Sequence, residues 1–174
     1  MRKLIVLLLL LLITTLPLIA EDNFDINLSI GNTQSNNFIE SNSYLAEGKI
    51  LYNLNPNSEF HLMIGTGFSY NTKSNIVNNV NFESFMIDKL YAGFEQEIDD
   101  TLTVSSLFST GIGRYLGGGR IYFASASLNL DLKIKFFRTF YFAPGIEIEN
   151  TSDFIYFKTK LGLGVKVWYL LYLY

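Results

Sequence analysis

From residue 24 to residue 169, apolar and polar side chains alternate along the chain with a period of two. The alternation is plainest near the C-terminus, where the odd positions from Phe157 to Val167 are apolar or threonine and the even positions are lysine or glycine. A period of two places successive side chains on opposite faces of a β-strand. Eight segments show this pattern, and we predict strands over residues 24–31, 44–52, 60–70, 90–97, 102–113, 122–136, 140–149 and 157–169.

The connections between these segments differ in length in a regular way. The second, fourth and sixth segments are followed by short turns, at residues 54–58, 99–100 and 137–139. The first and third are followed by longer stretches rich in Asn and Ser, at residues 32–42 and 71–81. Short turns at one end and longer loops at the other are typical of an up-and-down barrel. We therefore predict an all-β fold, an eight-stranded antiparallel up-and-down β-barrel.

Alternation alone does not say which face of the barrel is covered. A soluble secreted barrel of the lipocalin type would place its apolar face inside and carry a hydrophobic ligand. The polar face of this chain is rich in glycine, serine and threonine, which a narrow interior needs and a water-exposed face does not. Charges of both signs lie on that face, and we expect them to pair inside the lumen, because unpaired buried charge is costly. The predicted lumen polar network comprises Glu47, Lys49, His61, Glu95, Asp131, Lys133, Glu147, Lys158 and Lys160.

The apolar face carries aromatic residues at the strand ends that adjoin the short turns. Aromatic side chains at one level of a barrel form the girdle that lies at a membrane interface. We predict such a girdle from Phe24, Tyr52, Phe60, Phe94, Phe136, Phe140 and Tyr169. The small polar face and this girdle together favour a transmembrane β-barrel, with the soluble carrier as the further alternative.

The first twenty residues have the features of a secretory signal peptide. Arg2 and Lys3 precede an apolar run over residues 4–16, which is shorter than the roughly 20 residues of a membrane-spanning helix. We expect cleavage after Ala20, which leaves residues 21–174 as one outer-membrane barrel domain. Removal of Arg2 and Lys3 takes the formal charge from −3 for the whole chain to −5 for the mature chain.

The composition excludes several kinds of chemistry. The chain has no cysteine and one histidine, which rules out a disulfide framework, a thiol nucleophile and a multi-histidine metal site. A negative formal charge offers no basic field for nucleic acid. His61 is the one candidate for acyl-transfer chemistry, but no serine follows it two residues on and it lies near the turns. We therefore predict no catalytic residue, no metal site and no cofactor.

The last strand has a further pattern. Lys160, Gly162, Val165 and Val167 have the spacing polar-x-Gly-x-x-apolar-x-apolar, and the chain ends on the aromatic Tyr174. With eight strands and turns of two sizes, the chain resembles the small eight-stranded outer-membrane barrels of the OmpA/OmpX type. The resemblance implies export to the outer membrane of a bacterium and contact with outer-membrane lipid. It also implies that the barrel assembly machinery reads the final strand during biogenesis.

Three interpretations of function remain. The first is a structural or surface-interaction protein that binds an extracellular ligand through loops 32–42 and 71–81, because loops on a rigid scaffold carry binding sites. The second is a small pore, since glycines on the polar face would thin the packing of the lumen. The third, ranked well below, is a lipid-modifying enzyme at His61. Arg114 and Arg120 suggest a basic loop, for which contact with lipopolysaccharide phosphates is a hypothesis.

Overall fold

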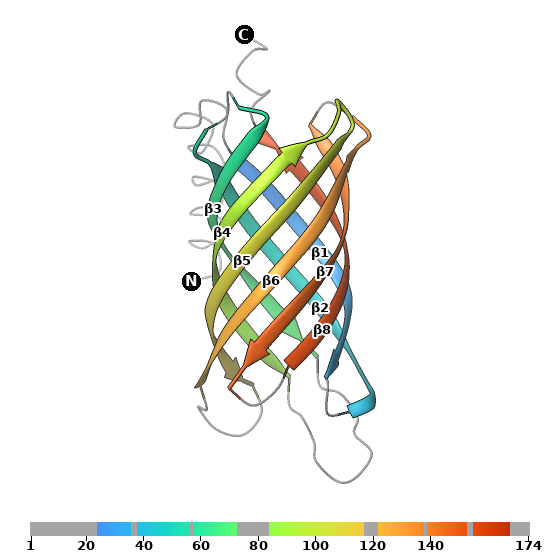
Figure 1. Ribbon diagram of the computed structural model, residues 1–174. Coiled ribbons are helices and arrows are strands. Elements are labelled where there is room, and N and C mark those ends of the chain that lie inside the picture. The colour runs from blue at the N-terminus through green and yellow to red at the C-terminus, as the bar shows by residue number, and fades with distance from the viewer. Residues whose placement is uncertain are drawn as a thin grey trace, which may run out of the picture.

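The computed structural model is a closed barrel of eight strands, in which each strand pairs with its neighbours in the chain and β1 pairs with β8 (Figure 1). The structure describes residues 24–35, 38–55, 58–72, 84–116, 122–137, 139–152 and 155–167. The strands are β1 Phe24–Ser35, β2 Phe38–Asn53, β3 Phe60–Asn71, β4 Phe85–Glu97, β5 Leu102–Tyr115, β6 Tyr122–Lys135, β7 Phe140–Thr151 and β8 Ile155–Lys166. All eight pairings are antiparallel, so the predicted fold is confirmed. Among the described residues, no helix has the length and hydropathy to span a membrane.

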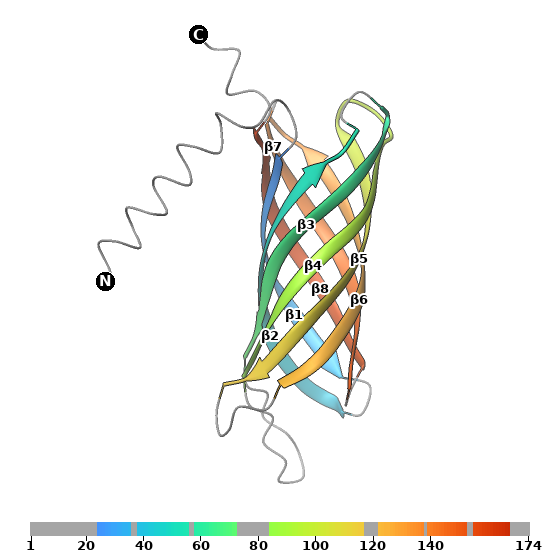
Figure 2. The ribbon, with the colours of Figure 1, turned by 90° about the vertical axis from the view of Figure 1, so that its left-hand side faces the viewer.

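The strands are strongly tilted against the barrel axis, as both Figure 1 and Figure 2 show. The register gives the tilt: following paired residues once around the barrel from Phe24 leads back to β1 at Gln34, ten residues further along. With eight strands, this stagger corresponds to a tilt of about 40°. A barrel of this size has an interior that side chains can fill.

The two ends of the barrel differ. The β2–β3, β4–β5 and β6–β7 connections lie at one end, which we call the turn end, together with Phe24 and Lys166. The other connections lie at the opposite end, which we call the loop end. The turn end is at the top of Figure 1, and the arrowheads of β5 and β7 point to the loop end at the bottom.

The prediction of a loop over residues 32–42 is wrong. β1 continues to Ser35 and β2 begins at Phe38, and these two residues are paired across the ladder. The ladder has one register irregularity, between Thr33 and Ser35. A strand rich in Asn and Ser is possible here because the outward side chains of a barrel need to be apolar only within its apolar band. Where a hairpin extends beyond that band, polar side chains are compatible with strand pairing. Of the second predicted loop, residues 73–81 lie outside the described residues.

β4 begins at Phe85, five residues before the predicted start. The inward face of its first half carries Phe85 and Ile87, which are buried apolar residues inside an otherwise polar lumen. Phe85 packs near Phe123 and Tyr156, with ring centroids 5.7 Å and 5.4 Å apart respectively. These inward apolar side chains broke the polar-inside pattern from which the strand start was predicted.

The β4–β5 turn is closed by the carboxylate of Asp99. Its Oδ1 atom accepts hydrogen bonds from the Thr101 hydroxyl and amide at 2.7 Å each, and from the Leu102 amide at 2.8 Å. These donors, led by the Thr101 hydroxyl, hold the pKa of the exposed Asp99 carboxyl below its ordinary value. The carboxylate therefore stabilises the turn at neutral pH, and this contribution is lost when acid protonates Asp99.

We expect Asp99→Ala to lower the melting temperature of the folded barrel in detergent at pH 7. The difference from the parent protein should narrow as the pH falls below the ordinary aspartate value of 3.8, because the protonated parent carboxyl has lost its advantage. Circular dichroism melts at pH 7 and pH 3 measure both effects. An Asp100→Ala control removes the adjacent exposed carboxylate. A difference that persists unchanged at pH 3 would show that the carboxylate charge is irrelevant to the turn.

Candidate functional site

The two faces of the barrel have opposite polarity. On β6, Leu128, Leu130 and Leu132 point outward and are exposed, whereas Asp131 and Lys133 point inward and are buried. The same distribution holds around the barrel, where the outward residues are mainly apolar and the inward ones mainly polar or charged. A soluble carrier needs the opposite arrangement, so that alternative is wrong. An apolar outer belt of this extent requires an apolar surrounding, as a membrane barrel has.

The lumen contains a balanced set of charges. Among the described residues, seven carboxylates and seven lysines face inward, and each takes part in at least one ion pair. They are Asp25, Glu47, Glu95, Glu97, Asp131, Glu147 and Glu149, and Lys49, Lys89, Lys133, Lys135, Lys158, Lys160 and Lys166. Their formal charges cancel, which avoids a large desolvation penalty for uncompensated charge.

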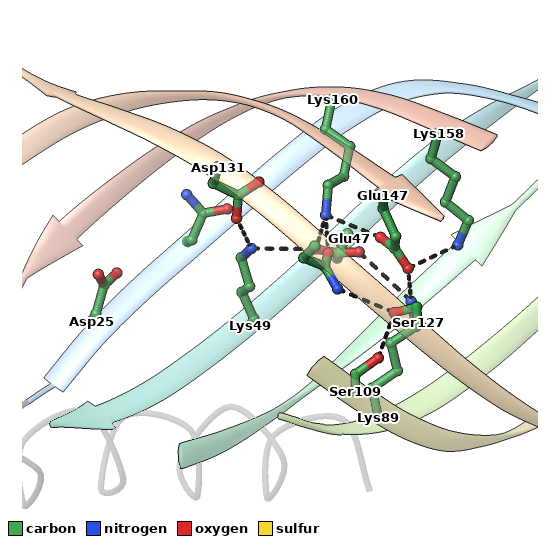
Figure 3. A network of polar contacts seen from close by, with 12 residues as sticks. Asp25, Glu47, Lys49, Lys89, Ser109, Ser127, Asp131, Glu147, Lys158 and Lys160 are labelled. Atoms are coloured by element: carbon green, nitrogen blue, oxygen red, sulfur yellow. Dashed lines mark hydrogen bonds and ion pairs between the residues drawn. The ribbon is translucent and has the colours of Figure 1, made fainter. Parts of the chain in front are cut away.

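Lys160 of β8 is the hub of the largest group of contacts. Its Nζ atom lies 3.0 Å from a carboxylate oxygen of Glu47 on β2 and 3.0 Å from one of Glu147 on β7. It also donates a hydrogen bond to the amide oxygen of Asn129 on β6. Figure 3 shows Lys160 reaching between these strands. One ammonium group thus links three other strands of the barrel wall.

Lys89 and Lys158 contact the second carboxylate oxygen of Glu147, the one that does not face Lys160, and they also contact Glu149. Lys89 pairs with Glu147 and lies 2.8 Å from Glu149. Lys158 lies 2.5 Å from Glu149 and 3.5 Å from Glu147. None of these four side chains has exposed surface. Two lysines and two carboxylates therefore form a closed, water-excluded group.

Lys49 and Asp131 connect opposite walls of the barrel. Lys49 is on β2 and Asp131 on β6, four strands away, and the two side chains form an ion pair across the lumen (Figure 3). Lys49 also lies 3.8 Å from Glu47, which joins this pair to the contacts of Lys160. We call the combined set the central network; it comprises Glu47, Lys49, Lys89, Asn129, Asp131, Glu147, Glu149, Lys158 and Lys160.

A smaller group, which we call the turn-end cluster, lies nearer the turn end. Lys133 of β6 pairs with both Asp25 of β1 and Glu95 of β4. The Tyr141 hydroxyl donates a hydrogen bond to Asp25, and the Lys133 ammonium lies 5.0 Å from the centre of the Tyr141 ring. This group again bridges separate parts of the wall through one lysine.

His61 lies at the turn end among polar neighbours. Its Nδ1 atom is 2.9 Å from the side-chain amide nitrogen of Asn53, and its Nε2 atom is 3.8 Å from a carboxylate oxygen of Glu97. Glu97 in turn lies 3.3 Å from Lys135 and 3.6 Å from Lys166. In acyl-transfer chemistry, one imidazole nitrogen contacts a carboxylate and the other contacts a hydroxyl nucleophile. Here Glu97 lies at Nε2, and the side-chain amide of Asn53 lies at Nδ1 in place of a hydroxyl. The arrangement is that of a hydrogen-bonded rim residue.

The predicted lumen residues are all inward and are brought together in these groups. The prediction omitted six charged lumen residues, namely Asp25, Lys89, Glu97, Lys135, Glu149 and Lys166. Lys89 was missed because its strand was predicted to begin at residue 90. The alternation itself could have found Asp25, since it is in phase with Asn27 on the polar face of the same strand.

Six of the predicted girdle residues face outward near the turn end. Their ring centroids are 5.2 Å apart for Phe24 and Tyr52, 5.0 Å for Phe60 and Phe94, and 6.3 Å for Phe136 and Phe140. The seventh, Tyr169, lies outside the described residues. Contact with a membrane interface stays a prediction for this set.

Two further candidate sites give little chemistry. No group of His, Cys, Asp or Glu within the described ranges could hold a metal ion, and the lumen carboxylates are adjacent to lysines, which repel cations. Arg114 is exposed at the loop end of β5, where a guanidinium nitrogen lies 3.8 Å from the Met86 sulfur. Arg120 and residues 117–119 lie outside the described residues.

Comparison with known proteins finds likeness in structure alone. No family model matches the sequence, and no curated protein matches it. The crystal structure of Ail, the attachment invasion locus protein of Yersinia pestis, in complex with the heparin analogue sucrose octasulfate superposes with a TM-score of 0.58 at 14% identity, covering 83% of this chain and 96% of that chain. Neisserial surface protein A gives a TM-score of 0.58 at 10% identity over 84% of this chain and 97% of that one.

A de novo designed transmembrane β-barrel is also similar, with a TM-score of 0.51 at 10% identity, covering 84% of this chain and 98% of the design. At these identities the likeness shows the fold and nothing further. The chain has the closed eight-stranded architecture of small outer-membrane barrels.

Proposed function

We propose that this chain is an integral β-barrel of a bacterial outer membrane, exported by residues 1–20, with a structural or surface-interaction role and no enzymatic activity. The observation that carries the proposal is the inverted polarity of the barrel, with a charge-balanced lumen and an apolar outer belt. The apolar belt supports a position in the membrane, because lipid surrounds the barrel wall and can contact apolar side chains around its whole circumference.

The size of the belt supports this proposal. On β8 the outward residues from Ile155 to Val165 are apolar or threonine, and these ten residues correspond to a rise of about 25 Å along the axis at a strand tilt of about 40°. The apolar band of outer-membrane barrels has about this height. Polar outward residues such as Asn32 and Asn150 are found toward the loop end, where the band should finish.

The proposed surface role belongs to the loop end. The connection between β3 and β4 is the longest between neighbouring strands, and its Asn-rich composition suits exposure to water. Ail has been crystallised with a heparin analogue, which is a polyanion. In the loop-end sequence of this chain the basic and acidic residues are equal in number, namely Lys73, Arg114 and Arg120 against Glu40, Glu83 and Asp153. We therefore propose an uncharged or weakly charged extracellular ligand in place of a polyanion.

Cysteine labelling tests the location and orientation, because the natural chain has no cysteine. Asn78→Cys places a thiol in the β3–β4 connection, and Asp100→Cys places one in the β4–β5 turn. In intact cells, a membrane-impermeant maleimide should label the first variant and leave the second unlabelled until the outer membrane is permeabilised. Labelling of both variants, or of neither, in intact cells would contradict the proposed orientation.

The pore alternative is tested by conductance. The central network and the turn-end cluster cross the lumen with paired side chains, which leaves little room for a path of water or ions. We expect purified refolded protein to give no steady conductance in planar lipid bilayers, with boiled protein as the control for detergent artefacts. Reproducible current steps of uniform size from the refolded sample would favour the pore.

A further inference from the structure

One turn at the turn end differs in chemistry from the others. The β4–β5 turn has the acidic residues Asp99 and Asp100, and the described part of the β2–β3 turn includes Asn55 and Ser58. The β6–β7 turn instead begins with Phe136 and Phe137. Phe137 is 69% exposed, whereas Phe136 and Phe140 beside it are 43% and 50% exposed. The two neighbouring turns each expose one large apolar side chain, Leu54 and Ile98, and continue with polar residues. The β6–β7 turn differs because two phenylalanines follow one another there.

Four phenylalanines gather at this turn and form one continuous apolar surface. The ring centroid of Phe136 lies 5.3 Å from that of Phe137, 6.3 Å from that of Phe140 and 4.6 Å from that of Phe142. We call these four residues the phenylalanine turn. The backbone amides of Phe136 and Phe137 both approach the Phe140 carbonyl oxygen, at 3.2 Å and 3.5 Å. The turn is thus held closed with its aromatic side chains on the outside.

The phenylalanine turn is continuous with the outer belt of the barrel. Outward residues of β6 and β7 lead to it without interruption by charge, and they include Leu132, Ile134 and Ile146, which are all exposed. Figure 1 shows β6 and β7 side by side along the barrel wall, and the register pairs Ile134 with Phe142. Phenylalanine has no polar atom that would hold it at a wet interface, unlike tyrosine or tryptophan. An apolar medium is therefore its natural surrounding.

We propose that the phenylalanine turn inserts into the periplasmic leaflet of the membrane, so that lipid covers Phe137 while Asp99 and Asp100 of the β4–β5 turn stay in water. This inference rests on the proposed membrane location. The two turns correspond in their backbone contacts, with Ile98 in the place of Phe136 and Asp99 in the place of Phe137. The apolar surface therefore reaches one residue further at β6–β7 than at β4–β5. The barrel is therefore tilted, with the β6–β7 side deeper in the lipid.

Tryptophan fluorescence tests the insertion, since Trp168 is the only tryptophan of the chain. Three variants are made in a Trp168→Phe background and refolded into phosphatidylcholine vesicles with or without brominated acyl chains. Phe137→Trp probes the turn, Leu130→Trp probes the middle of the belt, and Asp100→Trp probes the polar turn. Brominated chains quench tryptophan that touches lipid, and aqueous iodide quenches tryptophan that touches water.

We expect Phe137→Trp to resemble Leu130→Trp, with blue-shifted emission and strong quenching by brominated lipid. Asp100→Trp should emit at longer wavelength and be quenched by iodide instead. If Leu130→Trp is quenched by lipid but Phe137→Trp behaves like Asp100→Trp, the insertion is wrong and the membrane barrel stands. If Leu130→Trp also escapes lipid quenching, the proposed membrane location fails as well. If quenching of Phe137→Trp by brominated lipid decreases as the protein-to-lipid ratio is raised, a second barrel covers the turn, and the proposal is overturned.

Discussion

Lys160→Met should destabilise the folded barrel by about 3–5 kcal/mol, the range seen when one partner of a buried ion pair is removed. Methionine keeps the length of the side chain but removes the ammonium group that lies 3.0 Å from Glu47 and 3.0 Å from Glu147. Both carboxylates have no exposed side-chain surface, so water cannot replace the lost partner. Equilibrium urea unfolding in vesicles, followed by circular dichroism, measures the loss.

Two further variants make this result specific. Lys135→Met removes a partly exposed lysine whose carboxylate partner, Glu97, is also partly exposed, and we expect a change of about 1 kcal/mol or less. In the Lys160→Met background, Glu47 keeps only its longer contacts, at 3.8 Å to Lys49 and 4.0 Å to Lys89. Glu47→Gln in that background restores the charge balance of the lumen and should restore part of the stability. If Lys160→Met costs no more than Lys135→Met, the lumen is solvated, and the pore interpretation becomes the better one.

The sequence predicts which residues share the lumen but not which of them meet. Alternation places Lys49 and Asp131 on the polar face of two strands, because a strand has only two faces. Their contact depends on the stagger of the closed barrel, which joins positions 82 residues apart in the chain. That stagger is the sum of all eight registers, and no local pattern encodes it. Pairing within the network was therefore out of reach.

The errors in the strand limits have two separate physical causes. At β4, the inward Phe85 and Ile87 are apolar, so the polarity rule that identifies the lumen face fails where the lumen is filled by an aromatic cluster. At the β1–β2 hairpin, polar composition suggested a loop, although backbone pairing continues to Ser35. The polarity of a side chain depends on what surrounds it, whereas strand pairing depends on the backbone. Outside the membrane a paired strand can have polar side chains on both faces, so polarity no longer indicates where the strand ends.

Gly65→Ala should prevent stable folding or destabilise the barrel by about 3 kcal/mol or more, because overpacking against fixed backbone is costly. Gly65 faces the lumen on β3 and is paired with Leu51 on β2. A Cβ atom on Gly65 would collide with the carbonyl oxygen of Ile50 and lie 2.9 Å from the Leu51 Cα atom. Both obstacles belong to the backbone of the neighbouring strand, so relief requires the wall of the barrel to move.

Gly48→Ala is the matched control on the same pair of strands. Gly48 faces outward, and a Cβ atom there would lie 2.9 Å from a ring carbon of Phe68 and 3.3 Å from the Leu28 Cδ2 atom. Flexible side chains in lipid can shift, so we expect a loss of about 1 kcal/mol or less. Electrophoresis of unboiled samples, in which a folded barrel migrates differently from its boiled form, should show folded Gly48→Ala protein and little or none for Gly65→Ala. Equal folded fractions would mean that β2 and β3 are further apart than the register requires. The close approach of these strands, and with it the narrow lumen that brings the lysines and carboxylates together, would then be wrong.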